Sequence, residues 1–98
     1  MKRNKVLEIL ATHRAELRER FGVKSLALFG SVARDEAAAT SDVDLLVEFD
    51  RRIGLFHLID TEDYIRQSLG VEKVDLVMRR SVLPELRESI LSEAVDVL

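Results

Sequence analysis

A chain of 98 residues is the size of one domain, and 47% hydrophobic residues suffice for a single small core. The net charge of −3 and the aromatic content of 5% argue against a stand-alone nucleic-acid-binding module, because both phosphate neutralisation and base stacking lack the residues they need. The absence of cysteine, of a signal peptide and of any run long enough to span a membrane predicts a cytoplasmic protein, with one domain over residues 1–98.

The first predicted element is an amphipathic helix over residues 3–20. Its apolar side chains recur at three- and four-residue spacing, and Gly22 is well placed to end it. His13 falls on the apolar side of this helix. A half-buried packing role is favoured for His13 over a catalytic one.

Residues 24–29 predict a strand that is apolar on both faces, as expected when both are covered. A short helix is predicted over residues 31–39, with Ser31 as its N-terminal cap. Thr40-Ser41 then predicts a turn that leads into the next strand.

The second strand is predicted over residues 43–49, where the alternation is informative. Apolar side chains at the odd positions face one way, while Asp42, Asp44 and Glu48 face the other. One face is therefore core, and the other presents carboxylates near the start of the strand. Glu48 lies farther along and is predicted to be solvated rather than a metal ligand.

The remainder predicts a second amphipathic helix over residues 55–68, a third strand over 73–78 that carries Asp75, and a closing helix with Pro84 in its first turn. Helices alternate with strands throughout. The predicted fold is α/β (α+β), with a small mixed sheet of about three strands and helices mainly on one face. The face that carries the acids is left partly open.

The acids suggest a metal site. Asp42 and Asp44 project from the same strand face with their Cα atoms roughly 6–7 Å apart. Like charges at this spacing raise each other's pKa, and a divalent cation removes the penalty. Mg²⁺ prefers such oxygen ligands together with substrate phosphates, and a third acid such as Asp75 would allow two ions to assist phosphoryl transfer.

The turn at Gly30-Ser31 supplies a candidate phosphate site. In isolation it is typical of a plain strand-to-helix turn with a serine cap. However, glycine lets the backbone approach a phosphate, and a helix N-terminus presents free N–H groups. This turn and the acidic strand flank one short connection, which favours a shared triphosphate. Arg34, one helical turn on, would contact phosphate or pair with acids such as Asp35 or Asp42.

These residues resemble a known family. The segments 30–34, GSVAR, and 41–47, SDVDLLV, resemble the GSxAR…SDxDLLV signature of minimal nucleotidyltransferases, in the polymerase-β-like superfamily. The segment 73–77, KVDLV, resembles the strand that bears the third acid of the family. The resemblance covers essentially the whole chain. One departure is Asp35, where the family often has glycine.

The resemblance implies a nucleotidyltransferase fold and a role for each matching residue. Gly30 and Ser31, with Arg34, would bind the phosphates of ATP or another nucleoside triphosphate. The three acids Asp42, Asp44 and Asp75 would be the catalytic residues and the ligands of Mg²⁺, with Asp75 also helping to deprotonate the acceptor hydroxyl. The implied reaction is attack of that hydroxyl on the α-phosphate, which releases pyrophosphate.

Minimal members of the family are similar to the antitoxins of toxin–antitoxin pairs whose toxin is a helical HEPN-type ribonuclease. The resemblance therefore implies a hetero-oligomer in which this chain transfers AMP to a tyrosine of the toxin. Two alternatives are an antitoxin that neutralises by binding alone and a nucleotidyltransferase for a small molecule. The closing stripe from Leu83 to Val97 would serve mainly as core and partly as an interface.

Overall fold

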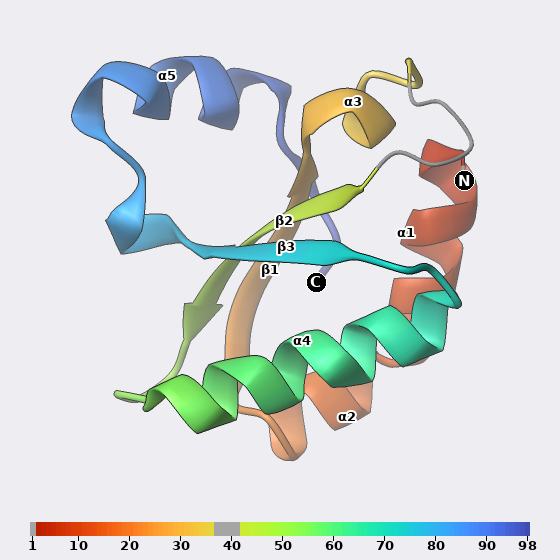
Figure 1. Ribbon diagram of the computed structural model, residues 1–98, viewed down its shortest axis with the longest axis vertical. Helices are drawn as coiled ribbons and strands as arrows, with labels where there is room; N and C mark the ends of the chain where they lie inside the picture. Colours follow the sequence, from red (N-terminus) through yellow and green to blue (C-terminus); the bar gives the residue numbers. More distant parts are fainter. Residues whose placement is uncertain (1, 37–41) are drawn as a thin grey trace.

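The computed structural model describes residues 2–36 and 42–98 and shows a four-stranded sheet with helices on both faces (Figure 1). The strands are β1 (Val23–Phe29), β2 (Val43–Phe49), β3 (Val74–Met78) and β4 (Val95–Asp96). They lie in the order β3-β2-β1-β4, with β2 and β3 parallel and both neighbours of β1 antiparallel to it. The predicted α/β class with a mixed sheet is confirmed.

The prediction of about three strands is one too low. Residues 84–93 are helical as expected, but the chain becomes extended at Ala94 and adds β4 to the free edge of β1. The apolar spacing of Ile90, Ala94 and Val97 continues past the end of the helix, so periodicity alone does not separate the two elements.

The helices are α1 (Arg3–Thr12), α2 (Arg14–Glu19), α3 (Gly30–Ala33), α4 (Leu55–Leu69) and α5 (Pro84–Glu93), with a 3-10 turn, η1 (Arg79–Ser81), before α5. The helix predicted over 55–68 extends one residue further and ends at Gly70 in the left-handed conformation, with φ of +69°. Pro84 opens α5 as predicted. None of the helices in the described part of the chain is long and apolar enough to cross a membrane.

The single helix predicted over residues 3–20 is wrong, because it breaks at His13 into α1 and α2. The apolar spacing runs through the break and carries no signal of it. At the break, Nδ1 of His13 lies 2.8 Å from the Tyr64 hydroxyl, and the two rings meet edge to face. His13 therefore packs against α4, in the structural role favoured from the sequence.

The core lies mainly between the sheet and helices α1, α2 and α4. Val43, Leu45 and Val47 of β2 point into it and are at most 1% exposed. A smaller cluster of Ala27, Leu46 and Val82 lies on the opposite face, where residues of α5 pack on it. The face that carries the acids is therefore covered by α5 in its middle.

The apolar stripes predicted for α4 and α5 are buried only in part. Leu55 and Ile59 of α4 are 67% and 40% exposed, whereas Ile65 and Leu69 are buried. Spacing of three and four residues fits more than one stripe of a helix, and here the first turns of α4 present theirs to solvent. Leu83 and Leu86 at the start of α5 are also exposed; the rest of that stripe packs as core.

The short helix predicted over 31–39 is wrong in its bounds and in its cap. α3 begins at Gly30, follows Phe29 without a side-chain cap, and gives way to a turn at Arg34. Gly30 has φ of +79°, so the chain turns at the glycine itself and places Ser31 inside the first turn. The predicted turn at Thr40-Ser41 lies outside the described residues.

Candidate active site

The parallel pairing of β2 and β3 brings the predicted acids together. Asp44 is opposite Asp75 in the register of the two strands. Neighbouring strands lie about 4.8 Å apart, so the two carboxylates share one edge of the sheet. Asp42 precedes Asp44 by two residues and therefore lies on the same face. The structure thus places all three acids at the amino-terminal ends of two adjacent strands.

Asp44 has a strongly raised pKa. Burial raises its pKa to about 6, and the negative charges of Asp75 and Asp42 act in the same direction. The carboxylate of Asp75 also shares a hydrogen bond with that of Asp44, which favours the protonated form. A carboxylate that resists ionisation in this way gains from a cation beside it.

Lys73 supplies one cation, which the sequence-based interpretation missed. Its Nζ lies 3.5 Å from Oδ2 of Asp42 and 3.8 Å from Oδ1 of Asp75. The signal in the sequence was its position two residues before Asp75, on the same strand face. All three side chains are substantially exposed, so these ion pairs are screened by solvent.

Glu62 is a further acid near the site that the alternation of the strands could not reveal, because it lies on α4. Burial raises its pKa, and the charge of Asp75 raises it further. Glu62 therefore lies near enough to Asp75 to add to the negative potential of the acidic edge.

The turn after β1 lies directly against Asp44. Phe29 pairs with Asp44 in the sheet, so Gly30 follows beside it. A Cβ added to Gly30 would collide with Oδ2 of Asp44, and its φ of +79° also disfavours any side chain. Glycine is therefore required here both by the turn and by the approach of the acid.

Arg34 pairs with acids, which was one of the two roles considered from its sequence, but its partners are Glu36 and Glu93 and not the suggested Asp35 or Asp42. Its Nε donates to Glu36 at 3.0 Å, and its guanidinium donates to both carboxylate oxygens of Glu93. The hydrogen bonds to Glu36 and then to Glu93 raise the pKa of Arg34. Glu93 is the last residue of α5 and lies 59 residues after Arg34, so no local pattern around Arg34 indicates this contact.

The backbone conformation at position 35 explains why an aspartate can stand where the family often has glycine. Its φ is +58°, a left-handed conformation that glycine adopts freely and that aspartate tolerates better than most residues. Its Oδ1 also accepts a hydrogen bond from the Arg3 N–H at 3.2 Å. The aspartate thus keeps the backbone turn and links it to the start of α1.

The donor set fits Mg²⁺ in its chemistry, since carboxylate oxygens are the preferred ligands of this ion. Asp44 and Asp75 are in register, and Asp42 lies two residues before Asp44 at the same edge. Within residues 2–36 and 42–98, however, no three acidic or histidine side chains are already converged on one point. The carboxylates of Asp42 and Asp75 would have to turn from Lys73 toward an ion.

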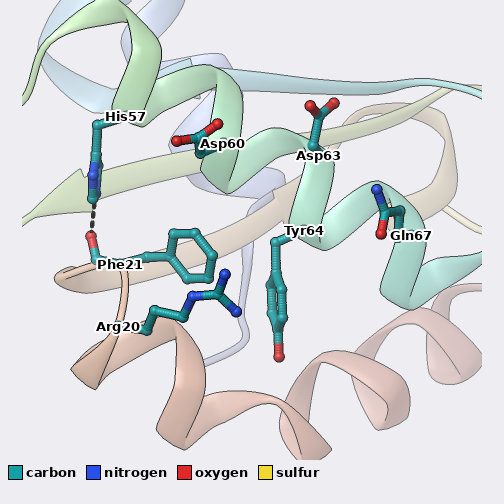
Figure 2. Close-up of a pocket in the computed structure, with 7 residues that line it drawn as sticks. All are labelled: Arg20, Phe21, His57, Asp60, Asp63, Tyr64 and Gln67. Carbon is teal, nitrogen blue, oxygen red and sulfur yellow. Dashed lines mark hydrogen bonds between the residues drawn. The ribbon is translucent and has the colours of Figure 1, made fainter.

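A hollow with a volume of about 490 Å³ lies elsewhere, between the end of α2 and α4 (Figure 2). The Arg20 guanidinium lies over the rings of Phe21 and Tyr64, and Nε2 of His57 donates to the Phe21 carbonyl at 2.6 Å. None of the three predicted acids lines it. The acidic edge remains the predicted site, since the pKa of Asp44 is raised there. The hollow is lined by Arg20, Phe21, His57, Asp60, Asp63, Tyr64 and Gln67.

Comparisons with known proteins show the family to which this chain belongs. The family model described as a nucleotidyltransferase domain matches residues 10–97. The protein adenylyltransferase MntA of Thermococcus cleftensis is 45% identical over 89 residues, which cover 91% of this chain and 89% of that protein. A relative from Methanocaldococcus jannaschii is 40% identical over 95 residues, 96% of each chain.

Solved structures share the fold. A chain described as a minimal nucleotidyltransferase superposes with a TM-score of 0.79 at 37% identity, covering 97% of this chain and 95% of its own. A toxin–antitoxin complex with AMP-PNP has a TM-score of 0.71 at 19% identity, covering 100% and 73%. The family match and the shared fold thus define a nucleotidyl-transferring enzyme. This chain belongs to the nucleotidyltransferase domain family, as the sequence motifs predicted.

Proposed function

We propose that this enzyme transfers AMP from ATP to a hydroxyl group of a partner protein, a HEPN-type toxin, and thereby acts as its antitoxin. The observation that carries the proposal is the in-register pair of Asp44 and Asp75 beside the Gly30 turn. Support for the acceptor class comes from the relative named protein adenylyltransferase. Support for the partner comes from the fold shared with an antitoxin in complex with a HEPN toxin.

In this proposal the phosphates of ATP lie at the turn after β1. The Gly30 and Ser31 backbone would donate to phosphate oxygens, and Arg34 would add charge-assisted hydrogen bonds. Asp42, Asp44 and Asp75 would hold Mg²⁺, which when bound neutralises phosphate charge and orients the α-phosphate. The close approach of Gly30 to Asp44 puts the phosphate site and the acids within reach of one triphosphate.

The reaction then needs an acceptor oxygen in line with the leaving pyrophosphate. A hydroxyl oxygen, from a tyrosine of the partner, forms a bond to the α-phosphorus. The bond from that phosphorus to the bridging oxygen breaks, and pyrophosphate leaves with the electron pair. The proton of the hydroxyl passes to the carboxylate of Asp75, which lies at the edge of the cluster and is 42% exposed.

The test is transfer of labelled AMP from ATP to a HEPN-type toxin mixed with this chain, with and without Mg²⁺. Labelling of the partner is expected, with loss of it in the Asp42→Asn/Asp44→Asn variant. Glu48→Gln is the matched control, because Glu48 lies on the same strand face but pairs with Ser25 and Arg79. Undiminished labelling by the double variant would overturn the assigned site. If the double variant transfers no AMP but still neutralises the toxin fully, the alternative of an antitoxin that acts by binding alone would be favoured.

A further inference from the structure

Glu93 accepts hydrogen bonds from two of the groups that we propose bind phosphate, the Gly30 N–H and the Arg34 guanidinium. Its Oε1 accepts the backbone N–H of Gly30 at 3.2 Å. Its two carboxylate oxygens accept the Arg34 guanidinium at 3.1 and 3.0 Å. The side chain of Glu93 is 27% exposed and that of Arg34 is 44% exposed, so the contact is only partly screened. An anion therefore already occupies the donors beside Gly30.

A carboxylate and a phosphate use the same donors in the same way. Both accept backbone N–H groups and the paired N–H groups of an arginine, and both carry negative charge. A triphosphate oxygen at Gly30 would meet the carboxylate of Glu93 at contact distance, where like charges repel. The two anions cannot hold the same donors at once.

We propose that Glu93 is an internal competitor of the nucleotide, which holds Gly30 and Arg34 in the free enzyme and leaves them when a triphosphate binds. This inference rests on the proposed nucleotide site. It gives α5 a function beyond packing, because the end of this helix sets the affinity of the enzyme for nucleotide.

The packing of α5 fits a carboxylate that moves rather than one that fixes the site. Ile90 and Leu91 of α5 pack on the smaller core cluster but are only partly buried, and no residue of this helix is fully buried, so its last turn is held less firmly than a helix with buried side chains. The chain after it is held to β1 by two paired residues and by the hydrogen bond from Val97 N–H to Leu26 at 2.8 Å. The last turn of α5 can therefore shift while β4 remains in the sheet.

The competing interpretation is that Glu93 positions Arg34 and Gly30 for the nucleotide. The affinity of the enzyme for nucleotide distinguishes this interpretation from competition. The dissociation constant of α,β-methylene-ATP with Mg²⁺ is measured by calorimetry for the wild type, Glu93→Gln and Glu93→Ala. Competition predicts tighter binding by both variants, about five- to tenfold, which corresponds to about 1–1.4 kcal/mol. Unchanged or weaker binding would overturn the proposal.

Glu88→Gln is the matched control, since Glu88 is an exposed acid on the same helix. It removes the same charge from α5 and should leave the affinity unchanged; an equal gain would show a general charge effect and would also overturn the proposal. Adding Arg34→Gln to Glu93→Gln should abolish most of the gain, because the released guanidinium provides it. Binding that is absent in every variant and in the wild type would instead refute the nucleotide site itself.

The wild type offers a measurement that needs no substitution. Displacement of Glu93 predicts faster hydrogen exchange in residues 91–94 when the nucleotide analogue binds, because the last turn of α5 loses its tether to Arg34. Slower exchange there would show that nucleotide binding tightens the contact, which contradicts competition.

Discussion

The two ends of β2 place acids on one face under opposite conditions. Asp44, near the start, lies beside Asp75, and burial and neighbouring charge raise its pKa to about 6. Glu48, four residues on, accepts the Ser25 hydroxyl at 2.8 Å and pairs with Arg79, and the Ser25 bond is the main cause of its lowered pKa. The same strand therefore stabilises the ionised form of Glu48 and disfavours the ionised form of Asp44.

This difference separates an acid with a structural role from an acid that is a candidate for a catalytic role. A structural acid is given a donor, as Glu48 is, and its ionised form stabilises the protein. An acid held among other acids, as Asp44 is, raises the free energy of the protein until a cation or a proton arrives. The acidic edge of β2 and β3 thus costs stability, which supports a functional role for it.

The largest contrast is expected in activity. Asp44→Asn and Asp75→Asn should each lower AMP transfer by on the order of a hundredfold or more, because each removes charge that would bind the metal and balance the phosphates. Glu48→Gln should leave transfer within about twofold of the wild type, since it lies outside the cluster. The initial rates of AMP labelling at saturating ATP measure both. Comparable losses of AMP transfer in the Asp44 and Glu48 variants would contradict the different roles assigned to the two ends of β2.

Gly30 tests whether the turn and the acid must touch. Gly30→Ala puts a methyl group onto Oδ2 of Asp44 in a left-handed backbone, so we expect a loss of stability above the roughly 1–2 kcal/mol of the backbone strain alone. AMP transfer should fall at least about tenfold, because Asp44 is displaced. Thermal unfolding and labelling rates measure the two effects.

Gly70→Ala is its matched control. Gly70 has a similar φ of +69°, but a Cβ there would meet nothing within 4 Å. This variant should lose only about 1 kcal/mol from backbone strain and keep its transfer rate. If both variants behaved alike, the contact between Gly30 and Asp44 would have no influence on the site.

The pH dependence of stability should have opposite signs at the two ends. Because the pKa of Asp44 is higher in the folded protein than its ordinary 3.8, its contribution to stability is present below about pH 4 and is lost as the pH rises through 6. Asp44→Asn in magnesium-free buffer should therefore raise the melting temperature at pH 8 but not at pH 4. After allowance for solvent screening, the gain is about 1 kcal/mol.

Glu48 should show the reverse. Its lowered pKa means that its contribution is present above its ordinary pKa of 4.5 and is lost as the pH falls. Glu48→Gln should lower the melting temperature at pH 7 and have little effect near pH 3. A stabilised Glu48→Gln, or a destabilised Asp44→Asn at pH 8, would contradict the assignment of the two environments.

The sequence predicted the strands better than the helices, for a physical reason. Period-two alternation over residues 43–49 identified β2 and its two faces, because a strand half covered by core must alternate. Apolar spacing on helices was less decisive. It ran through the break at His13 and past the end of α5, since the same spacing fits a packed turn or a short added strand.

The same limit applies to the site. Asp44 and Asp75 stood out because each interrupts an apolar strand, and the parallel register brought them together. Asp42 stood out because it precedes Asp44 by two residues at the start of β2. Glu62 and Glu93 could not be found this way, because they come from helices whose polar faces are rich in acids. Only the folded chain shows which of these acids turn toward Asp75 and Arg34.

The smallest expected effect concerns the hydroxyl that satisfies Glu48. Ser25→Ala removes the main cause of its lowered pKa and leaves the weaker contact to Arg79 at 3.4 Å. The pKa of Glu48 should rise toward its ordinary value, and the protein should lose about 0.5–1 kcal/mol at pH 7 without a change in AMP transfer. Carboxyl NMR titration and thermal unfolding measure these. A pKa that stays low would show that Arg79, rather than Ser25, separates Glu48 from the acids at the other end of the strand.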